Sequence, residues 1–257
     1  MLEVASSGSS RWDRLRHQLG FSIEDRAKGL YDSVPVLQAA SGDGAAHAPA
    51  SSENGVVITR GRLIHLRTFT PADLEHLSRW ADDEHLVRMV GSELLQVYKD
   101  VYEKDASFYD AVLVDTSQIV FIIMANDGSA EPVGLVRLFN IHQSEGYAGI
   151  ETILGGRRPE WRGFGVQASR LMAYYGVDVL GLRRIEAKAY EYNPLSINTL
   201  KRNGFTHEGT LRQASLRDGR YWDILVFGLL RPELEEQRRH DRYLLAPDRQ
   251  GDLSESS

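Results

Sequence analysis

The spacing of apolar and polar positions changes near residue 56 of the chain. Residues 39–55 are rich in Ala, Ser and Gly, and only a short helical spacing of apolar residues precedes them. From residue 56 onward, alternating and helical patterns follow one another with short polar gaps until about residue 232. We therefore predict an N-terminal extension with a flexible linker over 1–55, one compact domain over 56–232 and a charged tail over 233–257.

Strands are predicted where apolar or β-branched residues alternate or run together within the compact domain. These segments cover residues 63–69, 119–125, 133–141, 147–154, 185–189, 210–216 and 221–230. Turn signals at Asn126-Asp127-Gly128 and at Asp218-Gly219 join neighbouring segments as hairpins. Most of the sheet should therefore be antiparallel.

Helices are predicted between these strands. Thr70-Pro71-Ala72-Asp73 has the residues of a capping box, and residues 84–104 continue the helical spacing. A helix follows the strand at 147–154, and another begins at Asn193-Pro194 and ends at Gly204. The order predicts a mixed α/β domain in which helices flank a central, mostly antiparallel twisted sheet.

Composition excludes several classes of protein. The formal net charge is −6, whereas a general nucleic-acid binder usually carries a basic excess. No cysteine is present, so disulfides and thiolate chemistry are excluded, and the eight histidines are scattered rather than spaced as metal ligands. No apolar run reaches the roughly 18 residues of a membrane span. We expect a cytoplasmic protein with no metal, no membrane association and no nucleic-acid partner.

A turn with two glycines lies between the predicted strand at 147–154 and the helical pattern that follows it. It reads Arg162-Gly163-Phe164-Gly165-Val166-Gln167-Ala168. The glycines let backbone N–H groups approach an anion, and the helix start adds a partial positive charge. Such a turn can hold a diphosphate, although an ordinary tight turn would look the same. A dinucleotide fingerprint fits less well because Ala168 stands where its third glycine would be.

A second signal follows about 30 residues later in the chain. Asn193-Pro194-Leu195-Ser196-Ile197-Asn198 is followed by Lys201-Arg202-Asn203-Gly204-Phe205. Together with the glycine turn, these residues resemble the GNAT family of acetyl-CoA-dependent N-acetyltransferases, in the branch of the ribosomal-protein and spermidine acetyltransferases. The resemblance implies the GNAT acyl-CoA N-acyltransferase fold over 56–232. It also implies direct acetyl transfer from acetyl-CoA to a primary amine, on a small molecule or a protein N-terminus, without a metal.

The resemblance also assigns roles to individual residues. The expected cofactor contacts are Ile153 and Leu154 through their main chain, Arg162, Gly163, Phe164, Gly165, Val166, Gln167, Asn193, Ser196 and Asn198. Glu151 is the expected base for the ammonium, and Ser196 is a candidate proton donor for the leaving thiolate. Two structural alternatives stay open, namely that Glu151 pairs with Arg137 and that Asn193 caps its helix.

Two positions depart from the pattern of the family. Leu200 occupies a place where many relatives have a tyrosine general acid, and Glu160 stands where many have Gln or Arg. The missing tyrosine leaves open a non-catalytic acyl-CoA sensor or scaffold that uses the N-terminal segment for a partner.

The acceptor site is expected in two regions, residues 82–110 and 212–223. The first region carries acidic and aromatic residues that suit an amine, namely Asp82, Asp83, Glu84, Glu93, Tyr98, Tyr102 and Tyr109. A solvated helix face would show the same pattern. The sequence does not identify the acceptor, and a homodimer is possible.

Overall fold

The structure is a computed structural model, and it describes residues 55–102, 105–156 and 158–240. The predicted extension, apart from Gly55, lies outside the described residues, and so does the tail beyond residue 240.

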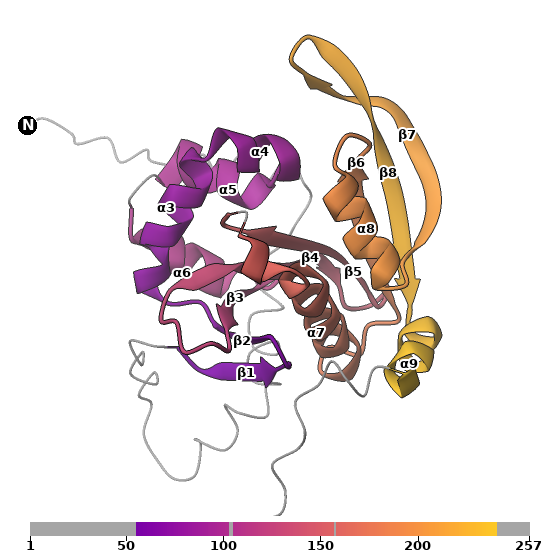
Figure 1. Ribbon diagram of the computed structural model, residues 1–257, viewed down its shortest axis with the longest axis horizontal. Coiled ribbons are helices and arrows are strands. Elements are labelled where there is room, and N and C mark those ends of the chain that lie inside the picture. The colour runs from indigo at the N-terminus through magenta and orange to yellow at the C-terminus, as the bar shows by residue number, and fades with distance from the viewer. Residues whose placement is uncertain (1–54, 103–104, 157, 241–257) are drawn as a thin grey trace, which may run out of the picture. The chain divides into compact units, whose positions relative to one another are not determined.

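Eight strands among the described residues form one sheet in the order β1-β2-β3-β4-β5-β6-β8-β7 (Figure 1). They are β1 (Val57–Arg60), β2 (Ile64–Thr68), β3 (Ile119–Ala125), β4 (Pro132–His142), β5 (Tyr147–Leu154), β6 (Arg184–Tyr190), β7 (Thr206–Arg217) and β8 (Arg220–Leu230). Only β5 and β6 are parallel, and the other neighbours are antiparallel. The predicted mixed, mostly antiparallel sheet is confirmed, although the sequence reasoning missed β1.

Helices connect the strands where the sequence predicted most of them. They are η1 (Pro71–Asp73), α3 (Leu74–Asp82), α4 (Glu84–Val90), α5 (Glu93–Val97), η2 (Tyr98–Tyr102), α6 (Ser107–Val114), η3 (Pro159–Trp161), α7 (Phe164–Asp178), α8 (Pro194–Arg202) and α9 (Arg231–His240). The region predicted as helical over 84–104 is divided at Gly91, which has a φ of +62° and ends α4. The sequence reasoning did not predict α6.

The sheet is covered on both faces, as alternate residues of β3 show. Ile122 and Met124 pack into a cluster with residues of α3, α5 and α6, among them Leu77. Phe121 points the other way and meets Tyr175 of α7 edge-on, with ring centroids 4.9 Å apart. Successive side chains of a strand point to opposite faces, so β3 separates the α3–α6 layer from α7.

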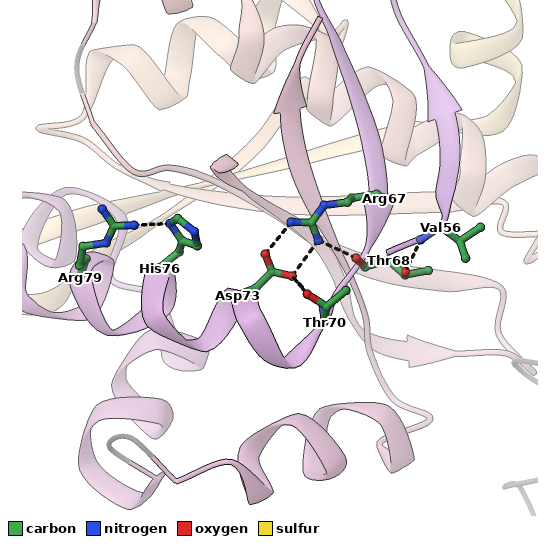
Figure 2. Close-up of polar contacts among 7 residues, drawn as sticks. All are labelled: Val56, Arg67, Thr68, Thr70, Asp73, His76 and Arg79. Carbon is green, nitrogen blue, oxygen red and sulfur yellow. Dashed lines mark hydrogen bonds and ion pairs between the residues drawn. The ribbon is translucent and has the colours of Figure 1, made fainter. Parts of the chain in front are cut away.

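The start of the first helical segment is fixed by a buried ion pair, which Figure 2 shows. Arg67 of β2 donates to both carboxylate oxygens of Asp73, at 2.7 and 2.6 Å. Asp73 also accepts from the backbone N–H and the hydroxyl of Thr70, which completes the predicted capping box. Both charges are almost fully buried, so removal of either partner would leave an uncompensated charge in the interior.

The C-terminal part of the sheet is more open. The turn between β7 and β8 has positive φ at Asp218 and Gly219, +52° and +72°, as the predicted Asp-Gly hairpin requires. Most residues of β7 are exposed, and the β7–β8 ribbon extends past the end of β6 (Figure 1). After the ribbon, α9 anchors to the domain through Leu234, which is 1% exposed.

Candidate active site

The two parallel strands at the centre of the sheet separate along their length. Residues 147–149 of β5 pair with residues 184–186 of β6, and no pair joins the strands after that. From there β5 pairs only with β4, while β6 continues beside β8. One edge of β5 after residue 149 therefore faces a gap between the strands.

The main chain of β5 alternates between β4 and this gap. The Gly155 N–H donates to the Val133 carbonyl of β4 at 2.9 Å. Because main-chain groups alternate along a strand, those of Ile153 also point to β4, whereas those of Thr152 and Leu154 point to the gap. A Cβ added to Gly134 of β4 would overlap the Ile153 carbonyl, which agrees with this direction. As a correction, the main chain of Ile153 is taken up by β4, whereas that of Leu154 is free for the expected contact.

The N-terminus of α7 directs unpaired amides outward. Gly163 precedes the helix with a φ of +92° and supplies no side-chain cap. Among the residues that the structure describes, none accepts a hydrogen bond from the N–H of Phe164, Gly165 or Val166. An α-helix leaves its first N–H groups without an intrahelical partner, and side-chain caps commonly satisfy some of them. Here three neighbouring donors remain available for an anion.

Gln167 differs from these three residues. Its N–H donates to the Gly163 carbonyl at 3.0 Å, which is the first hydrogen bond of the helix. Its side-chain Oε1 accepts from the N–H groups of Leu63 and Ile64 at 2.8 and 3.0 Å. The Gln167 side chain is thus buried and fastens α7 to the start of β2. We therefore correct its expected role from cofactor contact to structural anchor.

Arg162 and Glu160 flank the glycine turn on its outer side. Both side chains are exposed, and Arg162 has no ion-pair partner among the described residues. The ring of Phe164 is buried and stacks with Trp161, with centroids 6.5 Å apart. The turn thus combines a buried aromatic anchor with an exposed cationic side chain near the open amides.

Glu151 lies on the face of β5 that points away from α7, and it takes part in a hydrogen-bonded network. Its Oε2 accepts from Arg137 Nε at 2.7 Å and from the Ser92 hydroxyl at 2.9 Å. Arg137 also donates to Gln118 at 3.1 Å. The alternative of a cross-strand ion pair is therefore present. Within the described part of the chain, Glu151 Oε1 accepts no hydrogen bond, and the side chain is 16% exposed.

The start of α8 is organised by Asn193. Its Oδ1 accepts from the Ser196 N–H at 3.1 Å, and its Nδ2 donates to the Met89 carbonyl of α4 at 2.8 Å. Asn193 is 7% exposed, so both polar atoms of its side chain serve the structure. The capping alternative is confirmed. The Ser196 hydroxyl and the exposed Asn198 side chain have no hydrogen-bond partner in the residues described.

The aromatic residues of the first predicted acceptor region belong mostly to the core. Tyr98 is 1% exposed and donates to the Leu74 carbonyl at 3.2 Å. Tyr102 and Tyr109 pack against the same cluster. Of the acidic residues, Asp83 caps α4 and Asp82 pairs with Lys99. Packing and capping therefore explain most of this pattern, whereas Glu84 and Glu93 are exposed.

A different aromatic group lies where α4 meets the β7–β8 ribbon. Tyr190 and Tyr192 stack with centroids 5.1 Å apart, and Trp222 of β8 meets Tyr192 edge-on at 4.9 Å. Tyr192 donates to the Arg88 carbonyl of α4 at 2.9 Å, and Arg88 pairs with Asp218 at 3.3 Å. The structure thus brings the two predicted acceptor regions together. An open hollow of about 810 Å³ runs along the ribbon, lined by Thr210, Leu211, Arg212, Gln213 and Asp223.

The chain also matches a known protein family. The acetyltransferase (GNAT) domain family matches residues 63–206. The chain belongs to the GNAT acetyltransferase family. The match covers both the glycine turn and the Asn193 segment, and the observed fold is the GNAT fold.

Individual relatives of this GNAT protein are also N-acetyltransferases. The uncharacterized N-acetyltransferase p20 of Bacillus licheniformis is 38% identical over 104 residues, which is 40% of this chain and 57% of that protein. The spermidine N(1)-acetyltransferase of Escherichia coli K12 is 25% identical over 190 residues, covering 73% of this chain and 97% of that protein.

A solved structure has the same fold. It is the spermidine N-acetyltransferase of Vibrio cholerae in complex with CoA and spermine, with a TM-score of 0.55 and 20% identity. The superposition covers 67% of this chain and 98% of that one. At this identity the likeness concerns the fold alone.

Several residues of this GNAT site were not found by sequence reasoning. Ser92 donates to Glu151, and Tyr190, Tyr192 and Trp222 form the aromatic group. The tyrosines come directly before Asn193, a position that could have drawn attention to them. Ser92 gave no such signal because its partner is 59 residues away.

The described part of the chain holds neither a candidate metal site nor a candidate membrane-spanning helix. No group of three or more His, Cys, Asp or Glu side chains there could hold a metal ion. No described helix combines the length and apolar character needed to cross a bilayer.

Proposed function

We propose that this GNAT protein transfers the acetyl group of acetyl-CoA to a primary amine by direct attack. The acceptor is a small molecule or a protein N-terminus. One observation carries the proposal: the open amides of Phe164, Gly165 and Val166 lie at the start of the helix that follows β5, the strand that parts from β6. An anion site next to a strand with free main-chain groups suits a long cofactor with a diphosphate at one end and a thioester at the other.

The proposed cofactor contacts follow from the free groups. The N–H groups at 164–166 bind the diphosphate, with Gly163 setting their direction and Arg162 adding a charge-assisted contact. The main chain of Leu154 hydrogen-bonds the pantetheine arm in the gap between β5 and β6. Ser196 and Asn198 of α8 contribute polar contacts from the other side of the gap, where their side chains are free.

Glu151 is proposed to prepare the acceptor. Its free Oε1 accepts a proton from the ammonium, directly or through water, while Arg137 and Ser92 hold Oε2. The neutral amine nitrogen then attacks the thioester carbonyl, the C–S bond breaks, and the nitrogen releases its second proton to Ser196 or to solvent, which in turn protonates the thiolate. No covalent bond to the protein forms.

The donor half of the proposal is tested by calorimetric titration of the protein with acetyl-CoA. We expect saturable binding at micromolar to low millimolar cofactor, with coenzyme A as a competitor. Absence of binding at millimolar acetyl-CoA would overturn the proposal.

The proposed base is tested by Glu151→Gln. The amide keeps the shape of the side chain but accepts a proton far less readily, so kcat should fall about 100-fold or more while acetyl-CoA affinity stays unchanged. The pH–rate profile should lose its acid limb. An unchanged profile would remove Glu151 from the mechanism.

The acyl-CoA sensor remains a second candidate because Leu200, at the position of the family tyrosine, is 6% exposed and contributes no acid. A panel of amines distinguishes the two functions. Tight acetyl-CoA binding without turnover of any acceptor would favour the sensor, and turnover of any amine would exclude it.

A further inference from the structure

Arg217, at the end of β7, has an unusual setting for a surface arginine. It is half-buried, and its Nε is buried with no hydrogen-bond partner in the described structure. No carboxylate forms an ion pair with it within the described residues, although Asp218 beside it pairs with Arg88. A buried donor without an acceptor costs about 1–3 kcal/mol, so the domain keeps this charged side chain in place at a cost in stability.

Two tyrosines lie near the Arg217 guanidinium. Its central carbon lies 5.9 Å from the centroid of the Tyr190 ring. Hydrogen bonding to the Tyr190 hydroxyl, with a smaller contribution from Tyr192, raises the pKa of Arg217 above its ordinary value and more than offsets desolvation. The side chain therefore carries a fixed positive charge that is oriented by neutral phenols rather than neutralised by an acid.

A chain of contacts leads from this charge to the proposed base. A Cβ added to Gly91 would overlap the Tyr190 hydroxyl, so the α4–α5 turn rests directly on that ring. The next residue, Ser92, donates to Glu151 at 2.9 Å. Two consecutive residues thus connect Glu151 on β5 with the Tyr190–Arg217 pair on β6 and β7.

We propose that the amine acceptor carries an anionic group, a carboxylate or phosphate, which Arg217 binds beside Tyr190 and Tyr192 while the amine reaches Glu151. The inference rests on the proposed acetyl transfer and narrows its acceptor. A second ammonium at this position would meet an uncompensated cation, so a polyamine is a poor fit. A guanidinium fork instead matches a carboxylate or phosphate in geometry and charge.

The test compares acceptors that differ only in the sign of the distal charge. Acetylation of ω-amino carboxylates is measured against diamines of equal chain length. A second arm uses peptides with Asp or Lys next to the free N-terminus, which distinguishes a small acceptor from a protein one. We expect higher kcat/KM for the anionic member of each pair in at least one arm.

The residue is tested by Arg217→Gln, with Arg217→Lys as the variant that keeps the charge. Loss of a charge-assisted contact should lower kcat/KM for the anionic acceptors about 10- to 100-fold, and lysine should restore part of it. Diamine kcat/KM and acetyl-CoA affinity should not fall. Arg239→Gln serves as the control because Arg239 is an exposed arginine on α9, outside both predicted acceptor regions.

Equilibrium binding of the same acceptor pairs, with coenzyme A present, gives a readout that needs no turnover. Selective binding of the anionic members that Arg217→Gln abolishes supports the inference even in a protein that does not turn over. A preference for the cationic member in both arms, or equal behaviour of wild type and Arg217→Gln, overturns it and leaves acetyl transfer intact. Failure of all acetyl-CoA binding would instead overturn the proposed function.

Discussion

The helices α7 and α8 begin in opposite ways. α7 follows a glycine with positive φ and has three consecutive amides with no acceptor among the described residues. α8 follows Asn193, whose side chain accepts from Ser196, while Pro194 has no N–H to satisfy. Within the part of the chain that the structure describes, the Leu195 amide alone lacks an acceptor at this helix start.

This difference suits the start of α7 to binding and the start of α8 to a structural role. Side-chain capping satisfies the donors of a helix start and fixes the chain that enters it. A glycine in the capping position leaves the donors open, at a cost in stability that a bound anion can offset. By this criterion, we propose α7 as the anion site of the domain, whereas α8 is fastened to α4 through Asn193.

The largest effect is expected from Val166→Pro on α7. Proline removes one open N–H and is tolerated in a first turn, and Gly165 before it has no Cβ for the ring to strike. Acetyl-CoA affinity should fall about 10- to 100-fold in calorimetry, with little change in melting temperature. Leu195→Pro removes the left-over amide of α8 and should leave the affinity unchanged. Equal loss in both variants would erase the distinction between the two helices.

A smaller effect, on stability instead of binding, is expected from Asn193→Ala. Loss of the cap should lower the free energy of unfolding by about 1–2 kcal/mol in urea titrations. Asn193→Asp keeps the capping oxygen but not the bond to Met89, so it should lose less. Reduced acetyl-CoA affinity at unchanged stability would instead make Asn193 a cofactor contact.

Arg162→Ala should weaken acetyl-CoA binding about 3- to 10-fold, because an exposed arginine adds one solvent-screened contact to the diphosphate. Its stability should not change. Arg239→Ala is the control, since that side chain is 74% exposed on α9 and pairs only with Glu236. A weakening that high salt does not reduce would count against an electrostatic contact.

The smallest expected effect is a pH dependence of stability that arises from His76 on α3. Burial, and then the nearby Arg79, lower the pKa of His76 below 6.5, and Arg79 donates to its Nδ1 at 2.6 Å (Figure 2). The folded state therefore resists protonation, so stability is full above pH 6.5 and declines as the pH falls through the lowered value. Unfolding free energies at about pH 7.5 and about pH 5 should differ less in His76→Gln. Acetyl-CoA affinity should be the same in both proteins.

Much of this protein could be predicted from short stretches of its sequence. Strand alternation located β3 and β5, the Asp218-Gly219 pair located the ribbon turn, and Asn193-Pro194 located the start of α8. These features depend on backbone preferences and on contacts a few residues apart. The glycine turn belongs with them, because the need for a positive φ at Gly163 can be read locally.

The tertiary structure alone decided which of these groups are free and which are occupied. Nothing in the sequence separates Gln167 from its neighbours in the glycine turn. In the fold, its side chain accepts hydrogen bonds from Leu63 and Ile64, about 100 residues earlier in the chain. Glu151 accepts a hydrogen bond from Ser92, which lies 59 residues earlier in the chain. Tyr192 donates one to Arg88 of α4, which lies 104 residues earlier. Local patterns specify elements because helix and strand preferences act over a few residues. Partners for charges and donors are set by how those elements pack, so the acceptor side of the site became visible only in the fold.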